Sequence, residues 1–108
     1  MSFTRISALD AHARWKAAPD TTVLLDVRQP EEVRLASVNG ALCIPMREVA
    51  ARLSEIDPAK DVLVLCHHGS RSMPVAAFLA RSGYARVSSV DGGIAAWSRD
   101  VDPTIPQY

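Results

Sequence analysis

The sequence predicts a single α/β domain built on a parallel sheet. Short runs rich in valine and leucine, typical of strands buried on both faces, alternate along the chain with segments of helical periodicity. Polar or glycine-containing loops follow three of these runs directly. The chain has 108 residues, 48% of them hydrophobic, which suffices for one core but not two. Regular alternation of strands and helices indicates a parallel sheet with helical crossovers.

Composition excludes several classes of function. The formal net charge is zero with 22% charged residues, so the chain lacks the strong positive field that selects nucleic acid or anionic membranes. No stretch approaches the ~18 apolar residues of a membrane helix, and the N-terminus lacks the apolar run of a secretion signal. Two cysteines, Cys43 and Cys66, make no disulfide framework. We expect a monomeric, cytoplasmic protein that binds neither nucleic acid nor a membrane.

The first two elements are a short edge strand over residues 3–6 and a helix. Ser7, with Asp10 three residues later, makes a capping-box-like start for this helix, and Pro19 follows its end. We assign no role to His12 and expect it to face solvent. The apolar residues that the helix carries are Leu9, Ala13 and Trp15.

A second buried strand covers residues 23–25 and ends in Asp26-Val27-Arg28. Pro30 and the two glutamates after it favour a helix N-terminus immediately beyond. Asp26 and Arg28 therefore lie at the C-terminal end of a strand. We interpret the two as a structural ion pair that supports the loop rather than as catalytic residues.

A third short strand is predicted over residues 42–44, after the turn signal of Asn39 and Gly40. We place the Cys43 side chain in the core. A role for it in resolving an oxidised or persulfidated Cys66 would need a proximity that the sequence does not show. The helix that follows carries apolar residues one turn apart, Val49 and Leu53.

The second half of the chain repeats the strand-loop-helix pattern twice. A central strand over residues 62–65 ends at Cys66, and a helix over residues 73–82 follows, with Gly83 at its C-cap. The last strand covers residues 87–90 and is followed by Asp91-Gly92-Gly93 and a helix anchored by Trp97. The tail over residues 102–108, with two prolines, is predicted to be extended.

The loop that joins Cys66 to the next helix carries the chemistry. The first N–H groups of a helix point outward and its dipole favours negative charge, so a thiolate is stabilised there. Arg71 adds positive charge at the helix start, and Gly69 lets the loop curl. A core cysteine needs neither, so we predict that Cys66 is a nucleophile and not simply a small buried residue.

Two other loops should meet the Cys66 loop. Parallel sheets bind ligands outside the carboxyl ends of their strands. The loops over residues 26–30, 66–72 and 91–93 all leave such ends. We therefore expect one mouth with Cys66 at its floor.

Four segments together resemble those of the single-domain rhodanese family of thiosulfate sulfurtransferases. They are Leu25–Glu32 with its Asp-Val-Arg, Gly40–Pro45, the loop Val64–Ser72, and Asp91–Trp97 with Gly-Gly-x-x-x-Trp. One departure concerns loop packing: residues 36–39 read Ala-Ser-Val-Asn where the family usually reads Gly-His-Ile-Pro. The resemblance implies a rhodanese-like fold, a five-stranded, mostly parallel sheet with helices on both faces.

The resemblance also implies an activity that needs no cofactor. Cys66 would take the outer sulfur of a small anionic donor such as thiosulfate and pass it, through a persulfide, to a thiol, cyanide or protein acceptor. The residues expected to bind the donor are His67, His68, Gly69, Ser70, Arg71 and Ser72.

Two alternatives to sulfur transfer stay open. A Cys-dependent phosphatase uses a similar loop, but with five residues between Cys and Arg; here residues 67–70 are only four, so the cradle is smaller. A rhodanese-like module that only docks partners or carries sulfur is the second, although retention of Cys66 argues for activity. We reject a metal site at His67 and His68, because a structural zinc ion needs four ligands and no second cluster is present.

Overall fold

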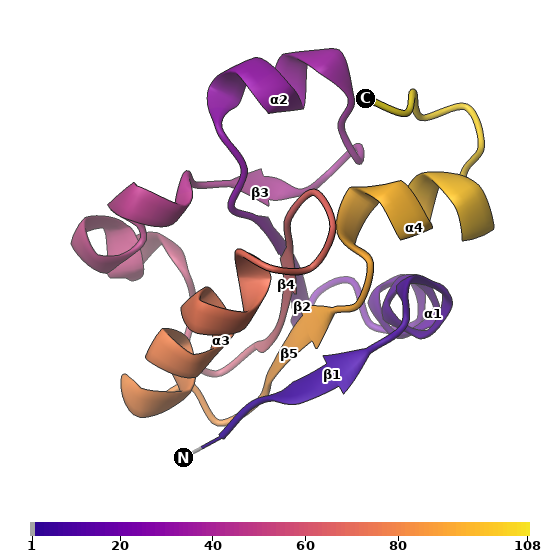
Figure 1. The fold of residues 1–108 in the computed structure, drawn as a ribbon. Coiled ribbons are helices and arrows are strands. Elements are labelled where there is room, and N and C mark those ends of the chain that lie inside the picture. The colour runs from indigo at the N-terminus through magenta and orange to yellow at the C-terminus, as the bar shows by residue number, and fades with distance from the viewer. Residues whose placement is uncertain (1) are drawn as a thin grey trace.

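Five parallel strands form the centre of the computed structural model, which describes residues 2–108 (Figure 1). Their order in the sheet is β1-β5-β4-β2-β3, and every neighbouring pair is parallel. The predicted fold class is therefore confirmed, and β1 lies at an edge as expected. The strands are β1 (Thr4–Ile6), β2 (Thr22–Asp26), β3 (Leu42–Cys43), β4 (Asp61–Leu65) and β5 (Val87–Val90).

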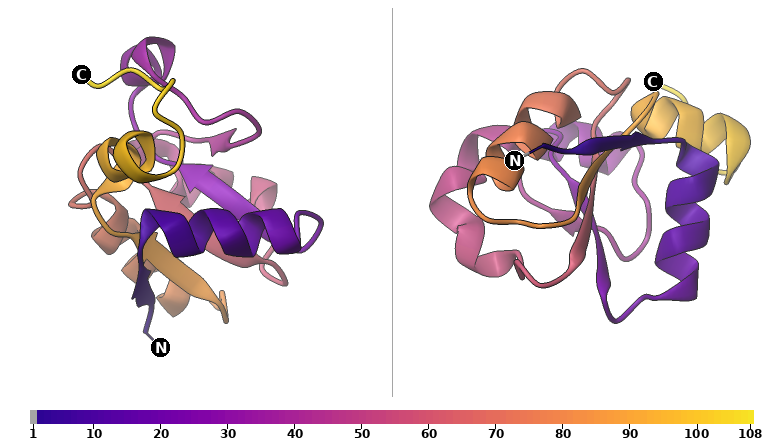
Figure 2. Two further views of the ribbon diagram at one scale, coloured as in Figure 1. Left: turned by 90° about the vertical axis from the view of Figure 1, so that its right-hand side faces the viewer. Right: turned by 90° about the horizontal axis from the view of Figure 1, so that it is seen from below.

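Helices cover both faces of the sheet, as the view from below in Figure 2 shows. One core includes Val62 and Val64 of β4 with residues of α3, whereas the other includes Leu63 and Leu65 with residues of α1 and α4. Alternate residues of the central strand therefore enter opposite cores, as its run of apolar residues predicts. The helices are α1 (Ala8–Ala17), α2 (Pro30–Leu35), α3 (Ser72–Arg81) and α4 (Gly93–Asp100).

Helix α1 begins where predicted but buries a different face. The Ser7 side chain accepts a hydrogen bond from the Asp10 N–H. Ala8 and Ala11 are buried, whereas Leu9 is 56% exposed. Small side chains face the sheet because they allow the helix to approach it closely. His12 is only half-exposed, since its ring packs edge-on against Trp97.

Two predictions around β3 are wrong. The helix expected after Pro45 is a pair of 3₁₀ helices, Met46–Glu48 and Ala50–Glu55, and the second is kinked at Arg52, whose φ of −118° and ψ of 24° are not helical. Cys43 is exposed rather than buried. It lies on the last strand of the sheet, which pairs with β2 alone, so one side of β3 is left uncovered.

The sequence predicts an extended tail over residues 102–108, but in the structure the tail folds back over α4. Ile105 is buried in the core that contains Trp97, and its carbonyl accepts a hydrogen bond from the Ser98 hydroxyl at 2.5 Å. Tyr108 therefore reaches the carboxyl ends of the strands. Within residues 2–108, no helix is both long enough and apolar enough to cross a membrane.

Candidate active site

Three loops meet at the carboxyl ends of β5, β4 and β2, which are neighbours in the sheet. The Val27 N–H donates to the Leu65 carbonyl at 2.9 Å, which joins the loop after β2 to the end of β4. The Ile94 N–H donates to the Cys66 carbonyl at 2.8 Å, which joins α4 to the loop after β4. The predicted loops thus surround one position, that of Cys66.

The Cys66 sulfur lies among hydrogen-bond donors at the start of α3. Its Sγ accepts from the N–H of Gly69 at 3.1 Å and from the N–H of Ser72, the first residue of the helix, at 3.3 Å. Cys66 follows β4 directly rather than ending it, and the residue is fully buried. Main-chain donors and the helix dipole together stabilise negative charge on this sulfur.

Two buried hydroxyls extend the site behind the sulfur. The Ser72 Oγ lies 3.4 Å from the Cys66 Sγ and 2.7 Å from the Oγ of Ser89. The Cys66 thiol donates to the Ser72 hydroxyl, which itself donates to the Gly69 carbonyl at 3.2 Å. When the thiol loses its proton, the Ser72 hydroxyl can turn from Gly69 to donate to Sγ, and Ser89 can then donate to Ser72. Ser89 was not predicted, although a polar residue in the buried strand β5 was a signal that could have indicated it.

Helix α4 holds the other side of the loop. Its first amides donate to the carbonyls of Cys66 and His67, at 2.8 Å from Ile94 and 3.1 Å from Ala95. Gly93 makes this approach possible, because it has a positive φ of 58° and a Cβ there would overlap both carbonyl oxygens. The glycine pair recognised in the sequence is therefore where the nucleophile loop and α4 touch.

Arg71 forms an ion pair with Glu32 that the sequence did not predict. Its two terminal nitrogens bind the two carboxylate oxygens of Glu32 at 2.6 and 2.8 Å. The hydrogen bond from Arg71 is the main cause that lowers the pKa of Glu32 to about 2, against the opposing effect of partial burial. Because this carboxylate offsets the charge of the guanidinium, Arg71 is not the free anion-attracting cation that the sequence suggested. Glu32 comes from α2, and no local pattern pairs it with Arg71.

This ion pair predicts a pH dependence of stability. Glu32 has a folded pKa of about 2, below the value of about 4.3 for an unfolded glutamate. Its contribution is therefore complete above pH 5 and is lost as the pH falls toward 2. Between pH 6 and pH 2, we expect urea unfolding to show the wild type losing about 1.5 to 3 kcal/mol more than Glu32→Gln. Parallel losses in the two proteins would contradict this.

Asp26 and Arg28 form the ion pair predicted from the sequence. Both side chains are fully buried, with the Arg28 Nη2 2.6 Å from Asp26 Oδ2 and its Nε 2.9 Å from Oδ1. The same guanidinium donates to the carbonyls of Glu32 at 3.2 Å and Ala36 at 2.8 Å. Both charges are therefore satisfied away from Cys66, and the pair holds the ends of α2 against β2.

The remaining predicted residues lie on the outer side of the loop. His68 and Ser70 are exposed, and the His67 ring lies stacked between His68 and Tyr108, with centroid distances of 3.8 and 3.9 Å. Tyr108 was missed, because nothing near it in the sequence indicates this contact. Among residues 2–108, no three His, Cys, Asp or Glu side chains are grouped as metal ligands.

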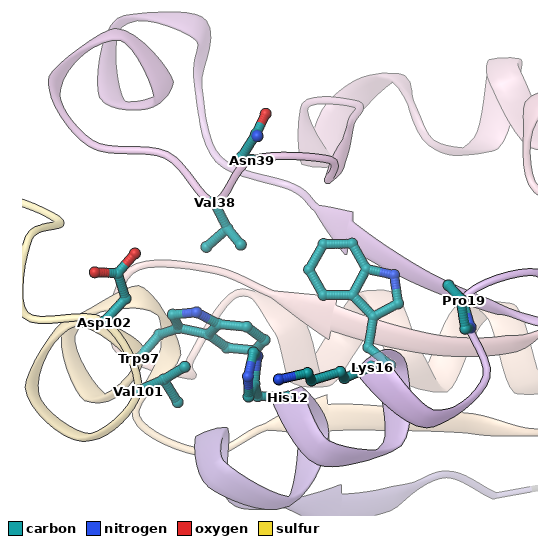
Figure 3. Close-up of a pocket in the computed structure, with 9 residues that line it drawn as sticks. His12, Lys16, Pro19, Val38, Asn39, Trp97, Val101 and Asp102 are labelled. Atoms are coloured by element: carbon teal, nitrogen blue, oxygen red, sulfur yellow. The ribbon is translucent and has the colours of Figure 1, made fainter.

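A cavity of about 620 Å³ lies on another part of the molecule, between α1, the turn at residues 38–39 and α4 (Figure 3). Trp15 and Trp97 form its aromatic wall, and none of the loop residues 66–72 lines it. The candidate active site is therefore a buried sulfur under a short loop and not this open cavity.

Comparison with known proteins identifies similar sequences and a similar fold. The family model described as "Rhodanese-like domain" matches residues 8–100. A protein of Allochromatium vinosum named "Sulfurtransferase" is 34% identical over 102 residues, which cover 93% of this chain and 95% of that protein. A solved structure of a rhodanese-related protein from Thermoplasma volcanium has a TM-score of 0.80 at 28% identity and covers 98% of this chain and 100% of that one.

A plant relative is longer. The Arabidopsis thaliana protein named "Rhodanese-like/PpiC domain-containing protein 12, chloroplastic" is 42% identical over 93 residues. The match covers 82% of this chain but only 31% of that protein. This chain therefore corresponds to about a third of the plant protein and to almost all of the bacterial one.

Proposed function

Because this chain belongs to the rhodanese-like domain family, we propose that it is a sulfurtransferase that carries one sulfane sulfur as a persulfide on Cys66. The observation that carries the proposal is the environment of Sγ, which accepts two main-chain N–H bonds at the start of α3. Such donors stabilise a thiolate, the form of cysteine that attacks sulfur.

The first half of the reaction loads the sulfur. The Cys66 thiolate attacks the outer sulfur of a donor such as thiosulfate, the donor's S–S bond breaks, and sulfite leaves with the electron pair. The N–H groups of His67, His68, Ser70 and Arg71 have no hydrogen-bond partner within residues 2–108, so they are free to bind the donor. We assign anion binding to these amides more than to the Arg71 side chain, because the Arg71 guanidinium is already paired with the Glu32 carboxylate.

The second half returns the enzyme to its starting state. A thiolate, cyanide or the thiolate of a partner protein attacks the outer sulfur of the persulfide. The Cys66 S–S bond breaks, and its electrons return to Sγ as the thiolate. The donors from Gly69 and Ser72 then stabilise the leaving thiolate as they stabilised the attacking one.

Mass spectrometry of the intact protein tests the proposal. After incubation with thiosulfate we expect a mass gain of one sulfur atom, which peptide mapping places on Cys66 and which a small thiol or cyanide removes. Release of sulfite should match the sulfur gained. A protein that gains no sulfur from thiosulfate or from a low-molecular-weight persulfide would exclude this activity and favour a docking module.

A further inference from the structure

The cavity between α1 and α4 is lined by both tryptophans of the chain (Figure 3). Its volume of about 620 Å³ lies within the range of about 300–1,000 Å³ that is typical of sites for small organic ligands. Trp97 is buried beneath it, and Trp15 is partly exposed beside it. Since no residue of the loop 66–72 lines the cavity, the proposed sulfur transfer does not use it.

One face of α1 supplies a side of the cavity. His12, Trp15 and Lys16 occupy positions i, i+3 and i+4, which project from the same side of a helix. The Trp15 ring is packed against the turn after α2, because a Cβ at Gly40 would come within 3.4 Å of two of its atoms. It also meets Trp97 edge-on, with ring centroids 6.3 Å apart. The aromatic surface is therefore fixed before any ligand arrives, which lowers the entropic cost of binding.

The opposite side is formed by the segment that departs from the family pattern. Val38 and Asn39 stand where the family usually has isoleucine and proline, and both line the cavity. Figure 3 shows Val38 across the cavity from Trp97. Valine is one methylene smaller than isoleucine, and asparagine lacks the proline ring. The departure seen in the sequence therefore lies at this cavity and not in the loop around Cys66.

The charges around the cavity favour an anion next to α1. Within residues 2–108, no carboxylate forms an ion pair with Lys16, whose side chain runs along α1 toward His12 in Figure 3. Asp102 lies beyond the end of α4, and its Oδ1 accepts bonds from the N–H and the hydroxyl of Thr104. Its charge also interacts with that of His12. The acid already has partners in the protein, whereas the Lys16 ammonium has none.

We propose that this cavity is a binding site for a small planar aromatic molecule that carries a carboxylate. The flat ring of the ligand lies against Trp15 and between the side chains of Val38 and Val101. Its carboxylate pairs with the Lys16 ammonium. The site is separate from Cys66, so it does not depend on the proposed sulfur transfer.

Titration with naphthalene-2-carboxylate tests the site and its charge preference. Because the chain has only two tryptophans and both line the cavity, the nuclear magnetic resonance signals of their indole N–H groups report on it alone. We expect both signals to shift and to saturate. Calorimetry should give naphthalene-2-carboxamide, which has the same rings without the charge, about fivefold weaker binding. Equal affinity for the amide, or tighter binding of 2-naphthylmethylammonium, would overturn the anionic ligand.

A lysine variant identifies the partner of the carboxylate. Lys16→Met keeps the apolar stem but removes the charge, so it should bind the carboxylate about fivefold more weakly and the amide as before. Lys60→Met is the matched control, since Lys60 is the other lysine of the chain and does not line the cavity. It should leave both affinities unchanged. Unaltered binding of the carboxylate by Lys16→Met would contradict the assigned contact.

Two further variants locate the ligand. Val38→Ile narrows the cavity and should weaken the binding of both naphthalene probes. Cys66→Ser should bind them like the wild type, so this result stands whether or not Cys66 carries sulfur. Indole signals that stay unchanged at millimolar naphthalene-2-carboxylate, or that drift without saturation, would show that the cavity is not a binding site for this class of molecule.

Discussion

Replacement of Cys66 by serine should abolish sulfur loading while leaving the fold intact. We expect no mass gain with thiosulfate and at least a ~10³-fold loss in rate, about 4 kcal/mol of transition-state stabilisation. The serine hydroxyl is far harder to ionise than a thiol and forms no stable persulfide. The fold should survive, because serine is close to cysteine in size and can accept the same bonds from Gly69 and Ser72. Intact-protein mass spectrometry and urea unfolding measure the two effects.

Cys43→Ser is the matched control. Cys43 is exposed on the edge strand, and burial of part of the side chain raises the pKa of its thiol, which disfavours the thiolate. This variant should load one sulfur at the wild-type rate. Sulfur found on Cys43 in the Cys66→Ser protein would reverse the assignment of the nucleophile. Cys66-dependent hydrolysis of an aryl phosphate, tested on the same proteins, would instead favour the phosphatase interpretation.

Much of the fold could be predicted because its strands carry a strong local signal. The apolar runs of β2 and β4 mark strands buried on both faces, and polar loops at their ends mark the mouth of the sheet. The edge of the sheet was harder. Cys43 looks like a core residue in sequence, and only the strand order shows that β3 has a single neighbour.

The site was predictable where chemistry and chain proximity coincide. Cys66, Gly69 and Ser72 lie within seven residues, and their contacts follow from one strand, one loop and one helix start. The partners of this loop come from far along the chain. Glu32 is 39 residues from Arg71, and Tyr108 is 41 from His67, so no periodicity or motif connects them. Burial of Ile105 brings the tail back, and that depends on the whole core.

The contact between α4 and the nucleophile loop leads to the largest predicted change in stability. A methyl group at Gly93 would overlap the carbonyl oxygens of Cys66 and His67, which belong to the backbone and cannot rotate away. The start of α4 must then move and weaken the bonds from Ile94 and Ala95. Adding the strain of a positive φ, we expect Gly93→Ala to lower the free energy of unfolding by at least about 3 kcal/mol.

Gly83→Ala isolates the steric part of this effect. Gly83 also has a positive φ, 97°, but a Cβ there would meet no atom within 4 Å. Its replacement should therefore cost only backbone strain, about 1 to 2 kcal/mol, and leave sulfur loading unchanged. The folded fraction of the Gly93→Ala protein should also load sulfur more slowly. Its displaced helix α4 no longer holds the carbonyls of Cys66 and His67, and with them the loop that carries Sγ. Equal losses of stability in the two variants, measured by urea unfolding, would show that the close approach of α4 to the Cys66 loop contributes nothing beyond the glycine conformation.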